Sequence, residues 1–243
     1  MIRSGQTANE SSGPLLIIFL RGGRAVEPQR QRFRGKCDLF TVCLVPGFTA
    51  AFASVGSLFD TNLSVLGNSM GHRLLFFVWG WITGGYYFWY TRYLFRLGQC
   101  GSRAARWLAG AAGLFMMWAV VIPYYPEKRP VLAALHVLFA FFSPILLAVS
   151  LGLFVAELGT RDPGRYQSAW RVMGVLIFAA VGILAVSGFI NSFLEMFLVA
   201  GICGYLRYLE RLLVEERAAD TSRGLRRAPQ VEQHAGHQKH RAP

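Results

Sequence analysis

The longest apolar stretch of the sequence, residues 172–209, is too long to cross a membrane only once. As one α-helix, these 38 residues would measure about 57 Å at a rise of about 1.5 Å per residue. The hydrocarbon core of a bilayer is about 30 Å thick, and about 20 apolar residues span it. The stretch therefore predicts two membrane-spanning helices that reverse direction in the segment SGFINSFLE, residues 187–195.

Four more apolar stretches precede this one, separated by short polar segments. Hydrophobic residues make up 53% of the 243 residues and charged residues only 16%, whereas a typical soluble domain is about a quarter charged. We predict membrane-spanning helices over residues 38–57, 74–95, 107–122 and 131–156. With the two helices of residues 172–209, the sequence predicts an all-α polytopic membrane protein whose six transmembrane helices form one bundle.

The ends of the chain are polar and basic. The sequence predicts a basic, disordered leader, a six-span membrane domain and a disordered cytoplasmic tail, over residues 1–36, 37–213 and 214–243 respectively. Lys and Arg also concentrate in alternate loops, and the intervening loops contain only Arg73, Lys128 and Arg129. Because cytoplasmic loops carry an excess of Lys and Arg, we expect both termini to be cytoplasmic.

The net charge of +12 raises the question of nucleic acid binding. The basic residues lie in the termini and in alternate loops, and none of the polar segments combines a basic face with interleaved aromatic residues. Such basic flanks are typical of cytoplasmic segments beside anionic lipid. We therefore expect membrane lipids as partners and no nucleic acid, and we leave a homo-oligomer open. The expected location is multi-pass in a membrane: the plasma or inner membrane of a bacterium, or an endomembrane of a eukaryote.

The polar residues expected within the membrane lie toward its outer face. His136 is the sixth residue of the fourth predicted helix, about 9 Å below its start. Glu195 and Asn191 are expected at the outer end of the last helical hairpin, and His72 and Arg73 at the outer end of the second helix. Ionisable groups are costly within a membrane and usually face a bundle interior or a cavity. The sequence therefore predicts an outer-leaflet polar pocket in which these five residues bind a ligand.

Two of these residues also have structural interpretations. His136 could form a hydrogen bond between helices, and Glu195 could cap the first turn of the last helix. The cytoplasmic half of the predicted bundle offers few comparable groups besides arginines, such as Arg207, whose charged ends reach the lipid headgroups.

Three functions remain open. The first is a lipid-associated membrane protein without enzymatic activity. The second is a proton-coupled transporter of small molecules, which would need polar groups in the cytoplasmic half as well. The third is a membrane-embedded lipid hydrolase or transferase with His136 as the base and Ser143 or Ser187 as the nucleophile.

Motifs of known chemistry are absent from the sequence. It contains no HExxH, no Ser-His-Asp spacing and no phosphate-binding glycine motif. The four cysteines show no C-x-x-C spacing, and they are Cys37, Cys43, Cys100 and Cys203. We therefore assign no catalytic residue, metal or cofactor, and the sequence favours a protein that is not an enzyme without deciding the point.

Several features together resemble the DRAM/Sfk-type superfamily. They are six helices with both ends inside, the proline-bounded turn and early histidine of YPEKRPVLAALHVLFAFFSPILLAVSL, and the acid that opens the last helix in NSFLEMFLVAG. The superfamily includes lysosomal autophagy modulators and proteins that remodel the lipid of GPI anchors. The chain is also similar to small bacterial membrane families of unknown function.

This resemblance covers about residues 38–213 and touches His136 and Glu195, and more weakly Pro130 and Arg73. Met196 stands where a Trp often follows the acid in the superfamily. The resemblance implies a lipid-facing membrane protein with a role in lipid remodelling or membrane stress, and it implies no known reaction.

Overall fold

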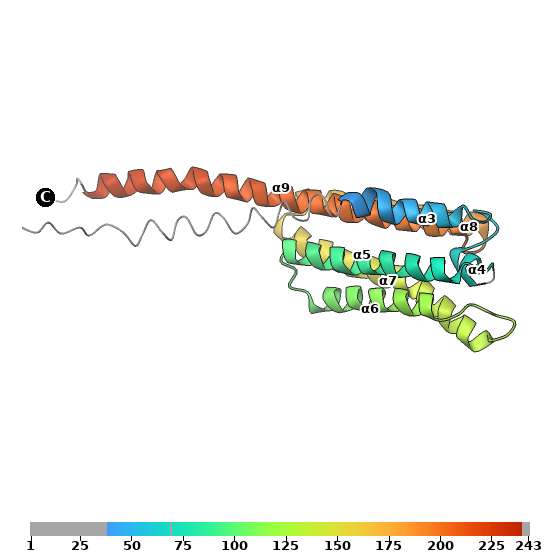
Figure 1. Cartoon of the computed structure of the whole chain (residues 1–243). Coiled ribbons are helices and arrows are strands. Elements are labelled where there is room, and N and C mark those ends of the chain that lie inside the picture. Colours follow the sequence, from blue (N-terminus) through green and yellow to red (C-terminus); the bar gives the residue numbers. More distant parts are fainter. Residues whose placement is uncertain (1–37, 69, 240–243) are drawn as a thin grey trace, which may run out of the picture. The chain divides into compact units, whose positions relative to one another are not determined.

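The structure is a computed structural model that describes residues 38–68 and 70–239. All regular elements among these residues are helices (Figure 1). In chain order they are η1 (Phe40–Leu44), α3 (Val45–Ala53), α4 (Leu63–Asn68), α5 (Arg73–Leu97), α6 (Arg103–Val121), α7 (Pro130–Arg161), α8 (Pro163–Ser187) and α9 (Ser192–Lys239). The predicted all-α class is confirmed for the described residues. The expected leader, residues 1–36, lies outside them.

Four of these helices are long and apolar enough to cross a membrane. They are α6, α7, α8 and the first part of α9, Ser192–Ala219. Long runs with few charges and little internal burial place apolar side chains on the outer surface, where contact with water is unfavourable. The four helices indicate an integral membrane location.

The first two predicted spans take different forms. Instead of one helix over residues 38–57, the structure has a shorter apolar helix from Phe40 to Ala53. Pro46 lies in its middle, at the start of α3, and the wider π-helical turn of η1 precedes it. A proline lacks the N–H that a regular helix needs at such a position, so a widened turn before it is expected. α5 has 25 residues, but its tyrosines, tryptophans and glycines make it less apolar than the other four.

The reversal predicted at residues 187–195 is confirmed. α8 ends at Ser187, and Gly188 follows with a φ of +72°, a left-handed conformation that glycine adopts without a Cβ clash. α9 then begins at Ser192 and continues to Lys239, through most of the segment for which the sequence predicts a disordered tail. The stretch EERAA at residues 215–219 contains strong helix formers, which favour continuation of the helix past residue 213.

The helices from Phe40 onward form one compact unit. α5 packs against α6, α3 and α9, α7 packs against α6 and α8, and α9 also packs against α3 and α8. Gly80 lets α5 approach α6 closely, since a Cβ atom there would collide with the side chain of Val120.

α4 is packed into one end of the bundle. Leu63 and Leu66 of α4 are both 0% exposed. The start of α9 binds the segment before α4, because the Ser192 N–H donates to the Thr61 carbonyl at 2.7 Å and the Phe193 N–H donates to the Leu58 carbonyl at 2.9 Å. Below, the "α4 end" of the bundle means α4, the turn of residues 122–129 and the start of α9.

Candidate functional site

His136 is enclosed by the α4 end. Its side chain is 1% exposed, and the rings of Tyr124 and Phe76 lie 5.3 and 6.2 Å from its own ring. Nδ1 is 3.0 Å from the Ile122 carbonyl oxygen, and Nε2 is 2.8 Å from the Ser64 hydroxyl oxygen. A carbonyl can only accept, so the proton of a neutral ring lies on Nδ1, and Nε2 accepts from Ser64.

Glu195 caps α4. It does not cap its own helix, α9, as the structural interpretation of the sequence had it. Its Oε2 atom accepts the backbone N–H of Leu63, the first residue of α4, at 2.7 Å. A carboxylate at a helix N-terminus satisfies a free N–H and complements the helix dipole. The cap of α9 is instead Asn191, whose Oδ1 accepts the Leu194 N–H at 2.9 Å while its Nδ2 donates to the Phe59 carbonyl at 3.4 Å.

Arg73 joins the other end of α4 to α6. Its guanidinium donates to Asn68 Oδ1, at the last residue of α4, and to the Val121 carbonyl at 2.5 Å. Together Glu195, His136 and Arg73 therefore hold the first, second and last residues of α4. His72 is half-buried just before α5 and makes no capping hydrogen bond with its side chain.

An open apolar groove with a volume of about 440 Å³ lies beside this cluster. We call it the α7 groove, and its lining residues are Tyr124, Pro126, Pro130, Ala133, Ala134, Val137, Leu138 and Phe141. None of the five predicted ligand residues lines it. It is nevertheless one side chain away from His136, because Tyr124 both lines the groove and contacts the imidazole.

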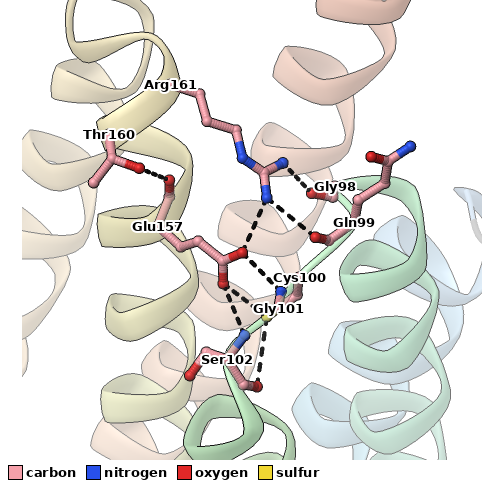
Figure 2. Close-up of polar contacts among 8 residues, drawn as sticks. All are labelled: Gly98, Gln99, Cys100, Gly101, Ser102, Glu157, Thr160 and Arg161. Carbon is pink, nitrogen blue, oxygen red and sulfur yellow. Dashed lines mark hydrogen bonds and ion pairs between the residues drawn. The ribbon is translucent and has the colours of Figure 1, made fainter.

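The opposite end contains a polar cluster that the sequence reasoning missed. Figure 2 shows the loop between α5 and α6 fastened to the last turns of α7. Glu157 accepts the backbone N–H groups of Gly101 at 2.7 Å and Ser102 at 3.0 Å. Arg161 pairs with Glu157 at 2.9 Å and donates to the carbonyls of Gly98 at 2.8 Å and Gln99 at 3.1 Å.

Cys100 lies inside this loop. Its thiol is 3.5 Å from Glu157 Oε2, and the residue is 8% exposed. Burial, and then the negative charge of Glu157, raise the pKa of the Cys100 thiol to about 11. The neighbouring Gln99 has a φ of +51°, which is uncommon for a residue with a Cβ.

A second carboxylate, Glu210, is buried between α9 and α5. The Tyr90 hydroxyl donates to it at 2.7 Å and the Tyr93 hydroxyl at 3.3 Å, and Arg207 pairs with it. Each of these carboxylates has an arginine three or four residues away on the same helix face: Glu157 has Arg161, and Glu210 has Arg207. This spacing is the feature of the sequence from which the two ion pairs could have been predicted. Glu157 and Glu210 lie just past the ends of the predicted membrane-spanning segments, residues 131–156 and 172–209, and these polar groups bind one another.

Neither of the two serines considered as nucleophiles, Ser143 and Ser187, forms its hydrogen bond with His136. Ser143 donates to the Ala112 carbonyl at 2.9 Å, and Ser187 donates to the Ile183 carbonyl at 2.8 Å. The hydroxyl that reaches His136 is that of Ser64. In the described part of the chain, no three His, Cys, Asp or Glu side chains are grouped so that they could hold a metal ion. Comparison with protein-family models, curated proteins and solved structures found no match to this chain.

Proposed function

We propose that this chain is a six-span membrane protein of the DRAM/Sfk type, with both termini cytoplasmic, that holds a membrane lipid in the α7 groove. The observation that carries the proposal is the groove itself, which is open, apolar and lined by one face of a helix long and apolar enough to cross a membrane. Apolar grooves on such a surface fit acyl chains, because a chain fills them without displacing hydrogen bonds.

The length of the groove fits one leaflet. Its lining runs along α7 from Pro130 to Phe141, which is about 16 Å at about 1.5 Å per residue. Half of a hydrocarbon core is about 15 Å deep. Ala133 and Ala134 have small side chains that leave room in the middle of the lining. An acyl chain lying along α7 would therefore reach from the membrane surface to about the bilayer midplane.

The turn above the groove is suited to a lipid headgroup. Lys128 and Arg129 are exposed there and form no ion pair with a described residue, while the exposed Glu127 offsets one of the two charges. A basic side chain near an anionic lipid surface contributes about 1 kcal/mol. We therefore assign the groove to a lipid with an anionic headgroup.

Three of the five residues predicted to bind a ligand support this site from behind. His136 is one helical turn from Ala133, and its ring contacts Tyr124 of the groove wall. Glu195 and Arg73 fix α4, which in turn contacts His136 through Ser64. In this proposal they position the groove and do not line it.

Retention of lipid by the full-length protein tests the proposal. Native mass spectrometry after extraction from phosphatidylglycerol-containing nanodiscs should detect one retained phospholipid on the wild type. Ala134→Trp fills the groove and should abolish retention, whereas Val181→Trp, on the exposed face of α8, should not. Equal retention by the two variants would contradict the proposal. The double variant Lys128→Ala, Arg129→Ala should remove the preference for phosphatidylglycerol over phosphatidylcholine.

A further inference from the structure

A hydroxyl, an imidazole and a carbonyl are aligned at the α4 end. Ser64 Oγ lies 2.8 Å from His136 Nε2, and His136 Nδ1 lies 3.0 Å from the Ile122 carbonyl oxygen. The carbonyl fixes the proton on Nδ1 and leaves Nε2 as the acceptor of the Ser64 hydroxyl proton. This is the arrangement of an activated nucleophile: a hydroxyl, a base within hydrogen-bond reach, and a third group that orients the base.

The surroundings of the pair favour chemistry with lipid. Ser64 is half-buried, whereas His136 is 1% exposed and therefore shielded from bulk water. The Tyr124 ring separates His136 from the α7 groove. A lipid whose acyl chain occupies the groove would bring its ester group to the α4 end, near the outer end of α7.

Asn68, one helical turn from the nucleophile, links it to a positive charge. Asn68 donates to the Ser64 carbonyl at 2.9 Å and accepts from the Arg73 guanidinium. A fixed cation near a reacting ester carbonyl stabilises the negative charge that develops on its oxygen. Arg73 is a positioning and electrostatic group in this scheme.

We propose that Ser64 and His136 form a nucleophile–base pair that cleaves or transfers the acyl esters of membrane lipids. Ser64 Oγ bonds to the ester carbonyl carbon while its proton passes to His136 Nε2. The bond from that carbon to the lipid alcohol breaks, and the alcohol leaves with the proton from Nε2. The acyl group on Ser64 is then released to water or to the hydroxyl of a second lipid, whose proton follows the same route through His136 to restore the Ser64 hydroxyl. The substrate class rests on the proposed lipid groove.

A serine-reactive probe separates this role from a structural hydrogen bond. The full-length protein in phosphatidylcholine nanodiscs is treated with a fluorophosphonate bearing a decyl chain, and phosphonylated peptides are quantified by mass spectrometry. We expect labelling at Ser64 and none at Ser143 or Ser187, which supply a comparison within the same molecule. An unactivated serine does not react with such probes, so a structural hydrogen bond alone would leave Ser64 unlabelled.

Variants assign the roles. Ser64→Ala should remove the label, and His136→Gln should slow labelling about 100-fold or more, the usual contribution of a general base. Ser143→Ala removes another buried hydroxyl of the bundle and should label Ser64 as the wild type does. Thermal unfolding in nanodiscs establishes that each variant is folded. If His136→Gln does not fold, the difference in labelling between Ser64 and Ser143 in the wild type still tests whether Ser64 is activated.

The outcomes separate the pair from the groove. No label at Ser64 under conditions that fully label trypsin would overturn the pair, and so would unchanged labelling in folded His136→Gln. If the protein still retains lipid in that case, the proposal that the α7 groove binds lipid stands. If Ala134→Trp slows the decyl probe but not an ethyl analogue, the groove delivers the chain to Ser64. If it slows neither probe while Ser64 is labelled, the pair stands and the assignment of the groove is wrong.

Discussion

At the scale of single residues, the polar side chains of the α4 end bind backbone and side-chain groups of α4. Glu195 binds the Leu63 N–H and His136 binds the Ser64 hydroxyl, across sequence separations of 132 and 72 residues. The sequence identified both residues as functional candidates because ionisable groups are costly in a membrane. It gave no indication of their partners, because neither a backbone N–H nor a single serine in a polar segment is a signal in a sequence.

Substitution of Glu195 tests its capping role. Glu195→Ala leaves the buried Leu63 N–H without an acceptor and should cost about 1–3 kcal/mol of unfolding free energy. Glu195→Gln keeps an acceptor oxygen and loses only the charge–dipole term, so its cost should be about 0.3–1 kcal/mol. Thermal or denaturant unfolding in detergent measures both. Equal losses of unfolding free energy in the two variants would show that Glu195 does not stabilise the protein through its hydrogen bond to Leu63.

The Cys100 thiol should resist alkylation at neutral pH. With a pKa of about 11, about one thiol in a thousand is ionised at pH 8, and the rate should rise about tenfold per pH unit up to the pKa. Glu157→Gln removes the negative charge that helps raise this pKa, so alkylation at a fixed pH should accelerate. Site-resolved mass spectrometry after iodoacetamide treatment measures the rate. A rate that is already maximal at pH 8 would contradict this account of the loop.

At the scale of elements, continuous apolar runs made α6 and α7 predictable to within about five residues. α8 begins at Pro163, nine residues before the predicted start at residue 172, because its first turns are polar. The reversal between α8 and α9 was predictable because one helix of that length cannot fit the membrane. α4 was not predictable, since its six residues follow the polar Asp60 and Asn62 and its burial depends on contacts from α7 and α9. The first predicted span, residues 38–57, was longer than the helix formed by η1 and α3, which runs from Phe40 to Ala53.

Two glycines of α5 provide a matched test of its packing. A Cβ at Gly80 would collide with Val120 of α6, so Gly80→Ala should cost about 1–3 kcal/mol through overpacking. Gly85 has no atom within 4 Å of the position of a Cβ, so Gly85→Ala should stabilise by up to about 1 kcal/mol through helix propensity. Unfolding of the two variants in the same detergent gives the difference. A stable Gly80→Ala protein would show that α5 and α6 are not in close contact.

At the scale of the whole molecule, the proposed cytoplasmic location of both ends rests on the distribution of Lys and Arg between alternate loops. The half-buried Glu157 and the buried Glu210, at the expected cytoplasmic end, were missed because their charges lie among the arginines that define that end. Their carboxylates accept hydrogen bonds from backbone and tyrosine groups, which only the folded arrangement brings together.

Reporter fusions test the topology. A reporter active only in the cytoplasm should work when fused after Pro243, and one active only outside should work when inserted after Glu127, in the turn beside the α7 groove. Cytoplasmic activity at both positions would contradict the six-span arrangement and would move the groove to the other leaflet.

The central claim is that a lipid chain occupies the α7 groove, and photo-crosslinking tests it most directly. Wild-type protein in nanodiscs containing a phospholipid with a diazirine in its acyl chain is irradiated, and the crosslinked residues are mapped by mass spectrometry. The account predicts that crosslinks concentrate on Tyr124 and on residues 133–141 of α7, above the level on the more exposed Val181 and Phe178 of α8. Crosslinks spread evenly over the exposed faces of α7 and α8 would contradict it.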